Sequence, residues 1–207
     1  MKHYILFYSI LFGLGLLLGF LQVDLILSFI IILLFGLLFV GITFHPILIT
    51  KNVEKTENYL MNNKKNPVYH LYYAISNKLD NEVEDAMARA LAKYKRPNKV
   101  AIFQVIYSMY HDDLDKAKQY VEFIPQKNYQ LYYYASILIE ENNLDDATIA
   151  AKELRASEWM KSIILGEIEL KQENQNEAKQ YIQKAFDKTR GMQRYSIYKH
   201  YQELLEK

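Results

Sequence analysis

The stretch Leu144-Asp145-Asp146-Ala147 decides the fold, because the chain repeats it at a nearly constant spacing. It recurs in altered form as Val83-Glu84-Asp85-Ala86, Leu114-Asp115-Lys116-Ala117 and Gln175-Asn176-Glu177-Ala178. The four alanines lie 31, 30 and 31 residues apart. A small residue stands twelve positions before each alanine, at Ala74, Val105, Ala135 and Gly166. Periods in the low thirties are typical of stacked helix-turn-helix units. One unit cannot bury its apolar face alone, so we expect an all-α solenoid of stacked units.

Prolines and polar turns mark the limits of these units. Pro67, Pro97 and Pro125 fall at three successive unit boundaries, where Pro is accepted because the first helical turn needs no N–H partner. Asn and Asp in the turns within units suit helix N-caps. The pattern predicts four helix pairs, at 68–78 with 82–95, 99–110 with 114–124, 128–140 with 144–155, and 159–172 with 175–188. Gly191 would end the last pair in a left-handed cap, and a helix over 192–205 would cap the array.

The spacing of small residues resembles the tetratricopeptide repeat family over about 67–188. The fourth unit matches best, with Leu165-Gly166 in its first helix and a set in its second helix made of Ala178, Ile182 and Ala185. The other units supply Tyr73-Ala74 with Ala86 and Ala90, Val105 with Ala117, Val121 and Ile124, and Tyr134-Ala135 with Ala147, Ala151 and Leu154. The resemblance implies a repeat domain over 67–207, with about four tetratricopeptide-like helix pairs and a C-terminal capping helix.

Two apolar stretches precede the repeats. Residues 4–21 and 25–44 contain no charged side chain, and Gln22-Val23-Asp24 separates them. About twenty apolar residues are enough for a helix to cross roughly 30 Å of hydrocarbon. We therefore expect a two-helix transmembrane hairpin in residues 1–50, with a kink or break at His45-Pro46. A single long or re-entrant segment and a cleaved signal peptide are the competing interpretations.

Lysines around the apolar stretches predict the orientation. Lys2 precedes the first stretch and Lys51 follows the second, whereas the turn between them holds neither Lys nor Arg. Because cytoplasmic flanks carry the excess of Lys and Arg, both termini are expected in the cytoplasm. The expected location is therefore the cell membrane, with two spans.

Residues 51–66 are expected to form a juxtamembrane helix, over about 52–61, and a polar linker. Further basic residues follow around the boundary between the first two units. A solvated surface and contact with anionic lipid headgroups are open interpretations of this charge, and so is an acidic partner for the stretch from Arg89 to Lys99. The residues that would contact lipid are Lys64, Lys65, Arg89, Lys93, Lys95 and Arg96.

Composition excludes several classes of function. Residues 51–207 hold 24 Lys and Arg against 23 Asp and Glu, which are the totals of 25 and 24 less Lys2 and Asp24. That balance argues against nucleic-acid binding, which needs a concentrated basic face. The chain has no cysteine, which removes disulfides and thiolate chemistry. The five histidines are scattered, and no phosphate-binding loop or nucleophile elbow occurs. We expect no enzyme, no catalytic residue, no metal and no cofactor.

The family resemblance also implies a peptide-binding groove along the first helices of the units. Carried over by register, this groove contains Lys99, Ile102, Ile106, Tyr129, Tyr132, Ser136, Ile163 and Glu167. Tyr suits interfaces because its ring is apolar and its hydroxyl is polar. Packing of these tyrosines between helices is the other interpretation.

Together these features predict a membrane-tethered module whose cytoplasmic repeats recruit a protein or peptide partner, as an adaptor or scaffold. The alternative is an accessory subunit of a membrane enzyme or transport complex, which would contact that complex through the hairpin.

Overall fold

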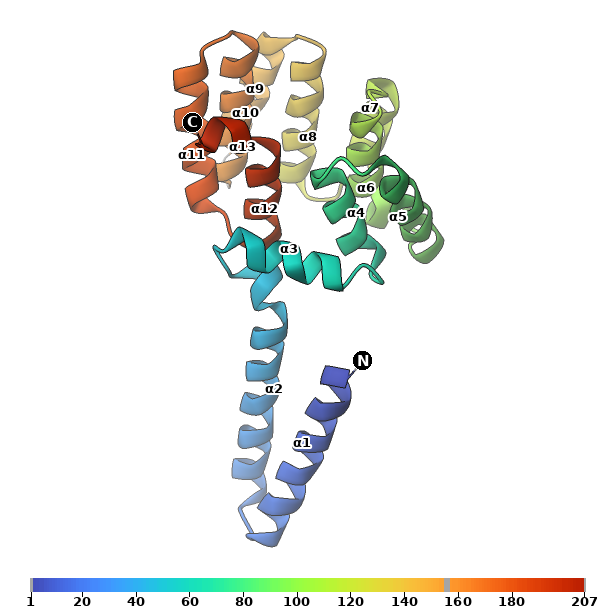
Figure 1. Cartoon of the computed structure of the whole chain (residues 1–207), viewed down its shortest axis with the longest axis vertical. Coiled ribbons are helices and arrows are strands. Elements are labelled where there is room, and N and C mark those ends of the chain that lie inside the picture. The colour runs from blue at the N-terminus through green and yellow to red at the C-terminus, as the bar shows by residue number, and fades with distance from the viewer. Residues whose placement is uncertain (1, 155–156, 207) are drawn as a thin grey trace. The chain divides into compact units, whose positions relative to one another are not determined.

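The computed structural model describes residues 2–154 and 157–206. This part of the chain is all-helical, with thirteen helices and no strand, which confirms the all-α prediction. The chain forms two compact units, Met1–Ile49 and Thr50–Lys207. Figure 1 shows both units, and each is considered by itself below.

The first unit is a pair of helices, α1 (Lys2–Phe20) and α2 (Leu25–Leu48). Phe7 of α1 stacks on Phe39 of α2, with 3.8 Å between the ring centroids. The turn between the helices is short because Gln22 adopts a left-handed conformation, with φ 52°. Asp24 then caps α2, and its Oδ1 accepts hydrogen bonds from the backbone N–H groups of the next turn, at 2.9 and 3.2 Å.

Helix α2 is long and apolar enough to cross a membrane. Over the described residues it is the one helix that meets both conditions, and Phe7–Phe20 forms a shorter apolar helix. Of the predicted kink or break at His45-Pro46, the break is wrong, because the helix continues through Pro46 to Leu48. Pro46 lies in the last turn, where one missing hydrogen bond costs little, and Ile49 N–H still donates to the His45 carbonyl at 3.0 Å.

The second unit begins with α3 and continues as four antiparallel helix pairs and two terminal helices. Their bounds are α3 Val53–Asn62, α4 Pro67–Ser76, α5 Asp80–Lys93, α6 Pro97–Tyr110, α7 Leu114–Val121, α8 Lys127–Glu140, α9 Leu144–Glu153, α10 Glu158–Lys171, α11 Gln175–Lys188, α12 Gly191–His200 and α13 Gln202–Glu206. In Figure 1 each pair runs up to a tight turn and back. The predicted helix pairs are therefore confirmed, with shifts of a few residues at their ends.

The repeated small residues lie where the two helices of a pair touch. Seven of these small residues are fully buried. They are Ala74, Ala86, Val105, Ala117, Ala135, Ala147 and Ala178, each 0% exposed. Gly166 shows why size matters, since a Cβ built there would lie 2.7 Å from Ile182 Cγ1 of the partner helix. The period in the sequence is thus a period of close helix contact, which only short side chains allow.

The turns within the four pairs share one backbone geometry. Lys78, Asp112, Asn142 and Glu173 all have positive φ, between 54° and 65°. The residue after each donates its N–H to the carbonyl five positions earlier in the preceding helix, as in Asn143 to Leu138 at 2.8 Å. This pattern is the Schellman motif, and it joins the helices without glycine. Asp113 and Asn143 then cap the second helix, as the sequence predicted.

Some predicted helix ends are wrong. Helices α4 and α6 begin on Pro67 and Pro97 themselves, because the fixed φ of Pro suits the first helical position. Gly191 does have positive φ, 52°, but α11 already ends at Lys188 and Gly191 opens α12. The expected single capping helix is divided at Tyr201, which is buried and separates α12 from α13.

Helices α3 and α12 close the array on itself. Helix α12 packs against α3 and α4 as well as α11, so the C-terminal part of the unit meets its first helices. Tyr195 is fully buried there, and its hydroxyl accepts a hydrogen bond from Asn77 Nδ2 at 2.6 Å. Lys199 forms an ion pair with Glu57 of α3 at 2.7 Å. The segment 51–66, expected to be a helix and linker, therefore packs with the repeats.

Candidate functional site

The structure separates the predicted groove residues into three groups. Ser136 and Ile163 are buried, at 7% and 1% exposure, so neither side chain offers surface to a partner. Lys99 is exposed in the first turn of α6. The remaining predicted residues are half-buried, namely Ile102, Ile106, Tyr129, Tyr132 and Glu167.

The C-terminal helices account for the buried part of the predicted groove. Ile163 lies in an apolar cluster with Ile197 and Tyr201, which belong to α12 and its end. The Tyr201 hydroxyl also donates a hydrogen bond to the Glu167 carboxylate. The chain's own last helices thus cover the inner face of the fourth pair, which the repeat pattern did not reveal.

Tyrosines from separate helices gather beside this covered region. Desolvation raises the pKa of Tyr72, on α4, to about 12, and the neighbouring Tyr129 phenol adds to the shift. Desolvation also raises the pKa of Tyr132 and Tyr133, and Tyr72 interacts electrostatically with both. These phenols are therefore neutral at pH 7 and act as hydrogen-bond donors and acceptors rather than as nucleophiles.

Tyr132 has a structural role as well. Its ring centroid lies 5.6 Å from that of Trp159 and 5.2 Å from that of Tyr133. It packs against the apolar clusters of the third and fourth pairs. The interpretation that tyrosines pack between helices therefore applies to Tyr132, which links two units.

Glu167 is the carboxyl group with the most perturbed acidity in this region. Desolvation raises its pKa to about 7, although the hydrogen bond from Tyr201 acts in the opposite direction. Nearby Glu140 raises the pKa further and Lys171 lowers it. Near neutral pH this carboxyl group is therefore divided between its two protonation states.

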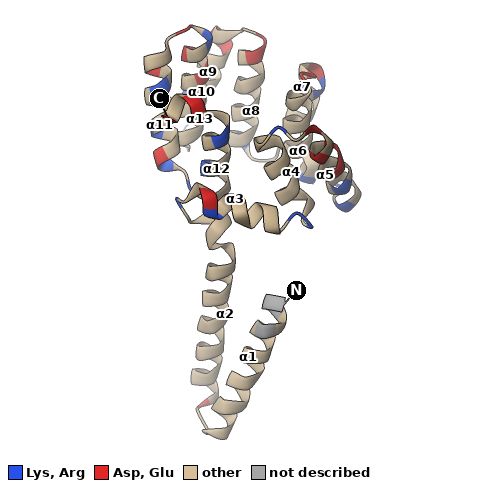
Figure 2. Cartoon of the chain, viewed as in Figure 1, with Lys and Arg blue, Asp and Glu red and all other residues tan. Residues whose placement is uncertain are grey.

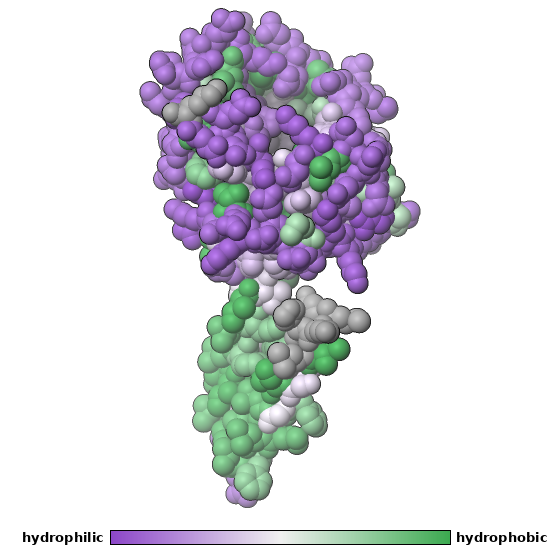
Figure 3. All heavy atoms as spheres, viewed as in Figure 1, coloured by the Kyte–Doolittle hydropathy of each residue, from purple (hydrophilic) through white to green (hydrophobic). Residues whose placement is uncertain are grey.

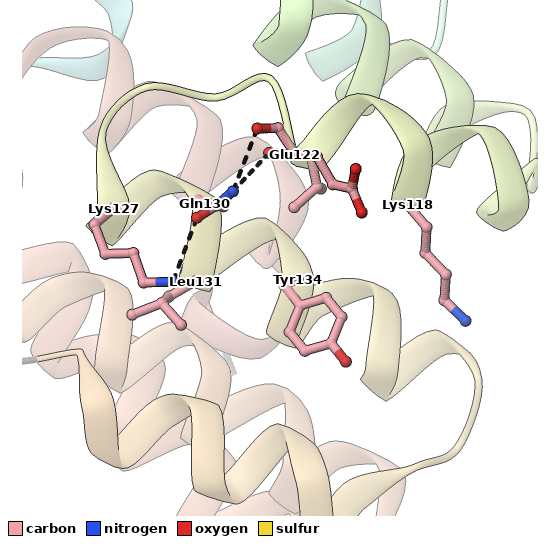
Figure 4. A pocket seen from close by; sticks show the side chains of 7 residues that line it. Lys118, Glu122, Lys127, Gln130, Leu131 and Tyr134 are labelled. Atoms are coloured by element: carbon pink, nitrogen blue, oxygen red, sulfur yellow. Dashed lines mark hydrogen bonds between the residues drawn. The ribbon is translucent and has the colours of Figure 1, made fainter.

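A groove lies between α7 and α8, where the second and third pairs meet (Figure 4). Its volume is about 390 Å³. Apolar atoms of Val121, Leu131 and Tyr134 line it, and charged residues stand at its edge. Gln130 Nε2 donates weakly to the Val121 and Glu122 carbonyls, at 3.4 and 3.5 Å, which ties the α7–α8 loop to α8.

Sequence reasoning missed this groove. Tyr134 is 42% exposed, and Phe123 in the adjoining α7–α8 loop is 52% exposed. The edge of the groove carries Lys118, Glu122 and Lys127. The short α7, which ends at Val121, leaves the α8 surface uncovered here. An apolar centre with a charged rim is the usual anatomy of a protein–protein contact.

The basic residues considered for lipid contact also separate into groups. Lys64 pairs with Glu82 at 2.6 Å, and Arg89 pairs with Asp85 at 3.0 Å. Arg89 also donates to the Lys64 carbonyl, so both cations hold α5 to the loop before α4. Lys65, Lys93, Lys95 and Arg96 are exposed.

The side-chain chemistry of the two units differs sharply. Figure 3 shows a hydrophilic surface over most of the visible face of the repeat unit and a hydrophobic surface on the α1–α2 unit.

In the part of the chain that the structure describes, no three His, Asp or Glu side chains gather as metal ligands. Comparison with protein-family models, curated proteins and solved structures yields no significant match.

Proposed function

We propose that this chain is a membrane-tethered adaptor. In this proposal α1 and α2 cross the cell membrane as a hairpin, and both termini lie in the cytoplasm. The tetratricopeptide-like array then recruits a protein or peptide partner. The anchor is supported by the apolar surface of α2 and by the lysines that flank the hairpin but not its turn.

The observation that carries the adaptor proposal is the groove between α7 and α8. The array is regular up to this junction, where α7 is two residues shorter than α9, the next second helix. The groove combines Leu131 and Tyr134 with a charged rim, which suits a partner segment with an apolar anchor. Tyr is a frequent anchor because it buries a large ring at low entropic cost.

Tyr129 and Tyr132 define the second surface that a partner would use, on the inner face of the array. Both remain half-buried in the structure, so a ligand there would meet only part of each side chain. We place the main contact in the α7–α8 groove because its side chains are more exposed.

Partner recovery distinguishes the two surfaces. Tyr134→Ala should weaken capture of the partner by roughly 1–2 kcal/mol or more without loss of helicity. Ile149→Ala is the matched control, since Ile149 is 56% exposed on α9 and lies outside the groove. Tyr132→Ala should instead destabilise the fold by about 2 kcal/mol, because it removes packing between two units. If Tyr132→Ala keeps normal stability but no longer captures the partner, the main contact lies on the inner face of the array and not in the α7–α8 groove.

The accessory-subunit alternative rests on the exposed apolar surface of α2. Replacing residues 1–49 with an unrelated membrane anchor separates the two functions. An adaptor keeps its partner and its activity in the cell after this replacement. An accessory subunit loses both, because its contact is made by the hairpin itself.

A further inference from the structure

The loop between α5 and α6, together with the helix ends that flank it, carries four cations that no acid neutralises. Lys93, Lys95, Arg96 and Lys99 are all exposed, and within the described residues none of them forms an ion pair. From Met87 to Tyr110 the sequence contains no Asp or Glu. The charge of this loop is therefore available to a ligand outside the chain.

Helix stability does not account for the two cations at the start of α6. Arg96 is the N-cap of α6 and Lys99 lies in its first turn, where the helix dipole disfavours cations. The second helices of the pairs follow the opposite rule and carry acids in their first turns, namely Asp80, Glu82, Asp115, Asp145, Asp146 and Glu177. The α6 cations thus oppose helix stability, which is expected where they serve an external anion.

The basic loop lies at the end of the array where the chain joins the apolar hairpin. The Thr50 carbonyl accepts a hydrogen bond from Gly191 N–H at 2.8 Å, which fixes the start of the unit beside the α11–α12 junction. That junction and the α5–α6 loop both follow the second helix of a pair, so in an array of antiparallel pairs both lie at the end opposite the turns within pairs. Along the chain, Ile49 alone separates α2 from Thr50.

The α5–α6 boundary differs in charge from the turns within pairs. It holds no acid between Met87 and Tyr110, whereas the turns include acids such as Asp112, Asp113, Glu141 and Glu173. Figure 2 shows red as well as blue at these turns. An anionic surface would therefore attract the α5–α6 boundary more strongly than the turns within pairs.

We propose that the basic loop, Lys93 to Lys99, docks the repeat unit on anionic lipid headgroups of the bilayer that α2 crosses. The inference rests on the membrane anchor of the proposed function. Each Lys or Arg close to an anionic membrane strengthens binding about fivefold. The one-residue connection to α2 tethers the repeat unit to the bilayer, so the effective concentration of its cations at the membrane is high. Docking would hold the acidic turns away from the bilayer.

A single fluorescent label tests the proposal, because the chain has no cysteine of its own. Asn98 is exposed between Arg96 and Lys99, so Asn98→Cys places the label in the loop. The full chain is reconstituted in nanodiscs of phosphatidylcholine, alone or with about 30% phosphatidylserine, with a quencher on the headgroups. The same label at Asn142, in the α8–α9 turn, serves as the reference position.

Docking predicts that quenching at residue 98 rises about threefold or more with phosphatidylserine, while residue 142 is unaffected. About 0.5 M NaCl should remove most of the rise, since it shortens the range of electrostatic attraction. The rise in quenching should be absent from the variant that combines Lys93→Gln, Lys95→Gln, Arg96→Gln and Lys99→Gln. A control that removes equal charge elsewhere should keep it, with Lys78→Gln, Lys116→Gln, Lys152→Gln and Lys179→Gln.

Failure of the membrane anchor and failure of the docking proposal give different results. If an alkaline wash strips the chain from liposomes, the membrane anchor of the proposed function is wrong. If the chain is retained but residue 98 is quenched no more than residue 142, the docking proposal is overturned. Equal quenching on both lipid mixtures, or protection of the label by an acidic protein alone, would overturn it as well.

Discussion

At the residue scale, the turns of the array depend on a conformation that L-residues avoid. Lys78, Asp112, Asn142 and Glu173 each adopt positive φ in a Schellman turn. A side chain in this region costs roughly 1–2 kcal/mol, and Asn tolerates it better than Glu. The fold therefore retains a small, local reserve of strain at each of these turns.

Replacement by glycine should release that strain. Glu173→Gly is expected to stabilise the fold by about 0.5–1 kcal/mol, because glycine adopts this φ freely. Asn142→Gly should give a smaller gain, since Asn already accepts the conformation. Urea unfolding of fragment 51–207 measures both. A loss of stability in Glu173→Gly would show that its side chain contributes more than its backbone costs.

Glu167 makes the stability of the array depend on pH. Its pKa is raised from 4.5 to about 7, so the folded chain holds this proton more tightly than the unfolded chain. Unfolding therefore releases a proton between these pH values, and stability falls as the pH rises through them. Glu167→Gln should match the natural chain near pH 5 and exceed it by about 2 kcal/mol near pH 8. If the stability of the two chains changes with pH in the same way, the pKa of Glu167 is not raised in the folded chain.

At the element scale, the small residues determine how closely each pair packs. Ala147→Leu and Gly166→Leu should each cost about 1–3 kcal/mol, because the added side chain has no space between the helices. Lys152→Leu is the control, since it introduces the same side chain at an exposed position of α9. Thermal unfolding of fragment 51–207, followed by circular dichroism, gives the difference. Equal stability in Ala147→Leu and Lys152→Leu would contradict the close packing.

The helices could be predicted from the sequence because their signals are local. Small residues, prolines and capping Asn and Asp act within one or two turns, so they located the four pairs to within a few residues. Closure of the array by α12 could not be predicted, because Tyr195 meets Asn77 across 118 positions and no periodic signal marks that contact. The burial of Ile163 under α12 follows from that closure, and so does the covered part of the predicted groove.

The α7–α8 groove was missed for a related reason. Tyr134 entered the sequence analysis only as part of the Tyr134-Ala135 match to the repeat family, and the groove carried over by register did not include it. Helix α7 ends at Val121, three residues before the end at 124 that the sequence predicted, and Tyr134 is 42% exposed beside it.

At the scale of the whole molecule, the proposed topology gives a direct expectation. A reporter that is active only outside the membrane should be silent when fused after Lys207 and active when inserted beside Val23 in the turn. The reason is the excess of lysine on both flanks of the hairpin. Activity after Lys207 would mean that the hairpin crosses once or in the opposite direction.

The adaptor function is tested most directly by photo-cross-linking in native membranes. A photoreactive phenylalanine analogue replaces Tyr134 in the full chain, and a second version carries it at Ile149 on α9. The account predicts one discrete cross-linked partner from position 134, none from position 149, and the same partner after residues 1–49 are exchanged for an unrelated anchor. No product from position 134, together with products from a position on α2 such as Leu34, would contradict it.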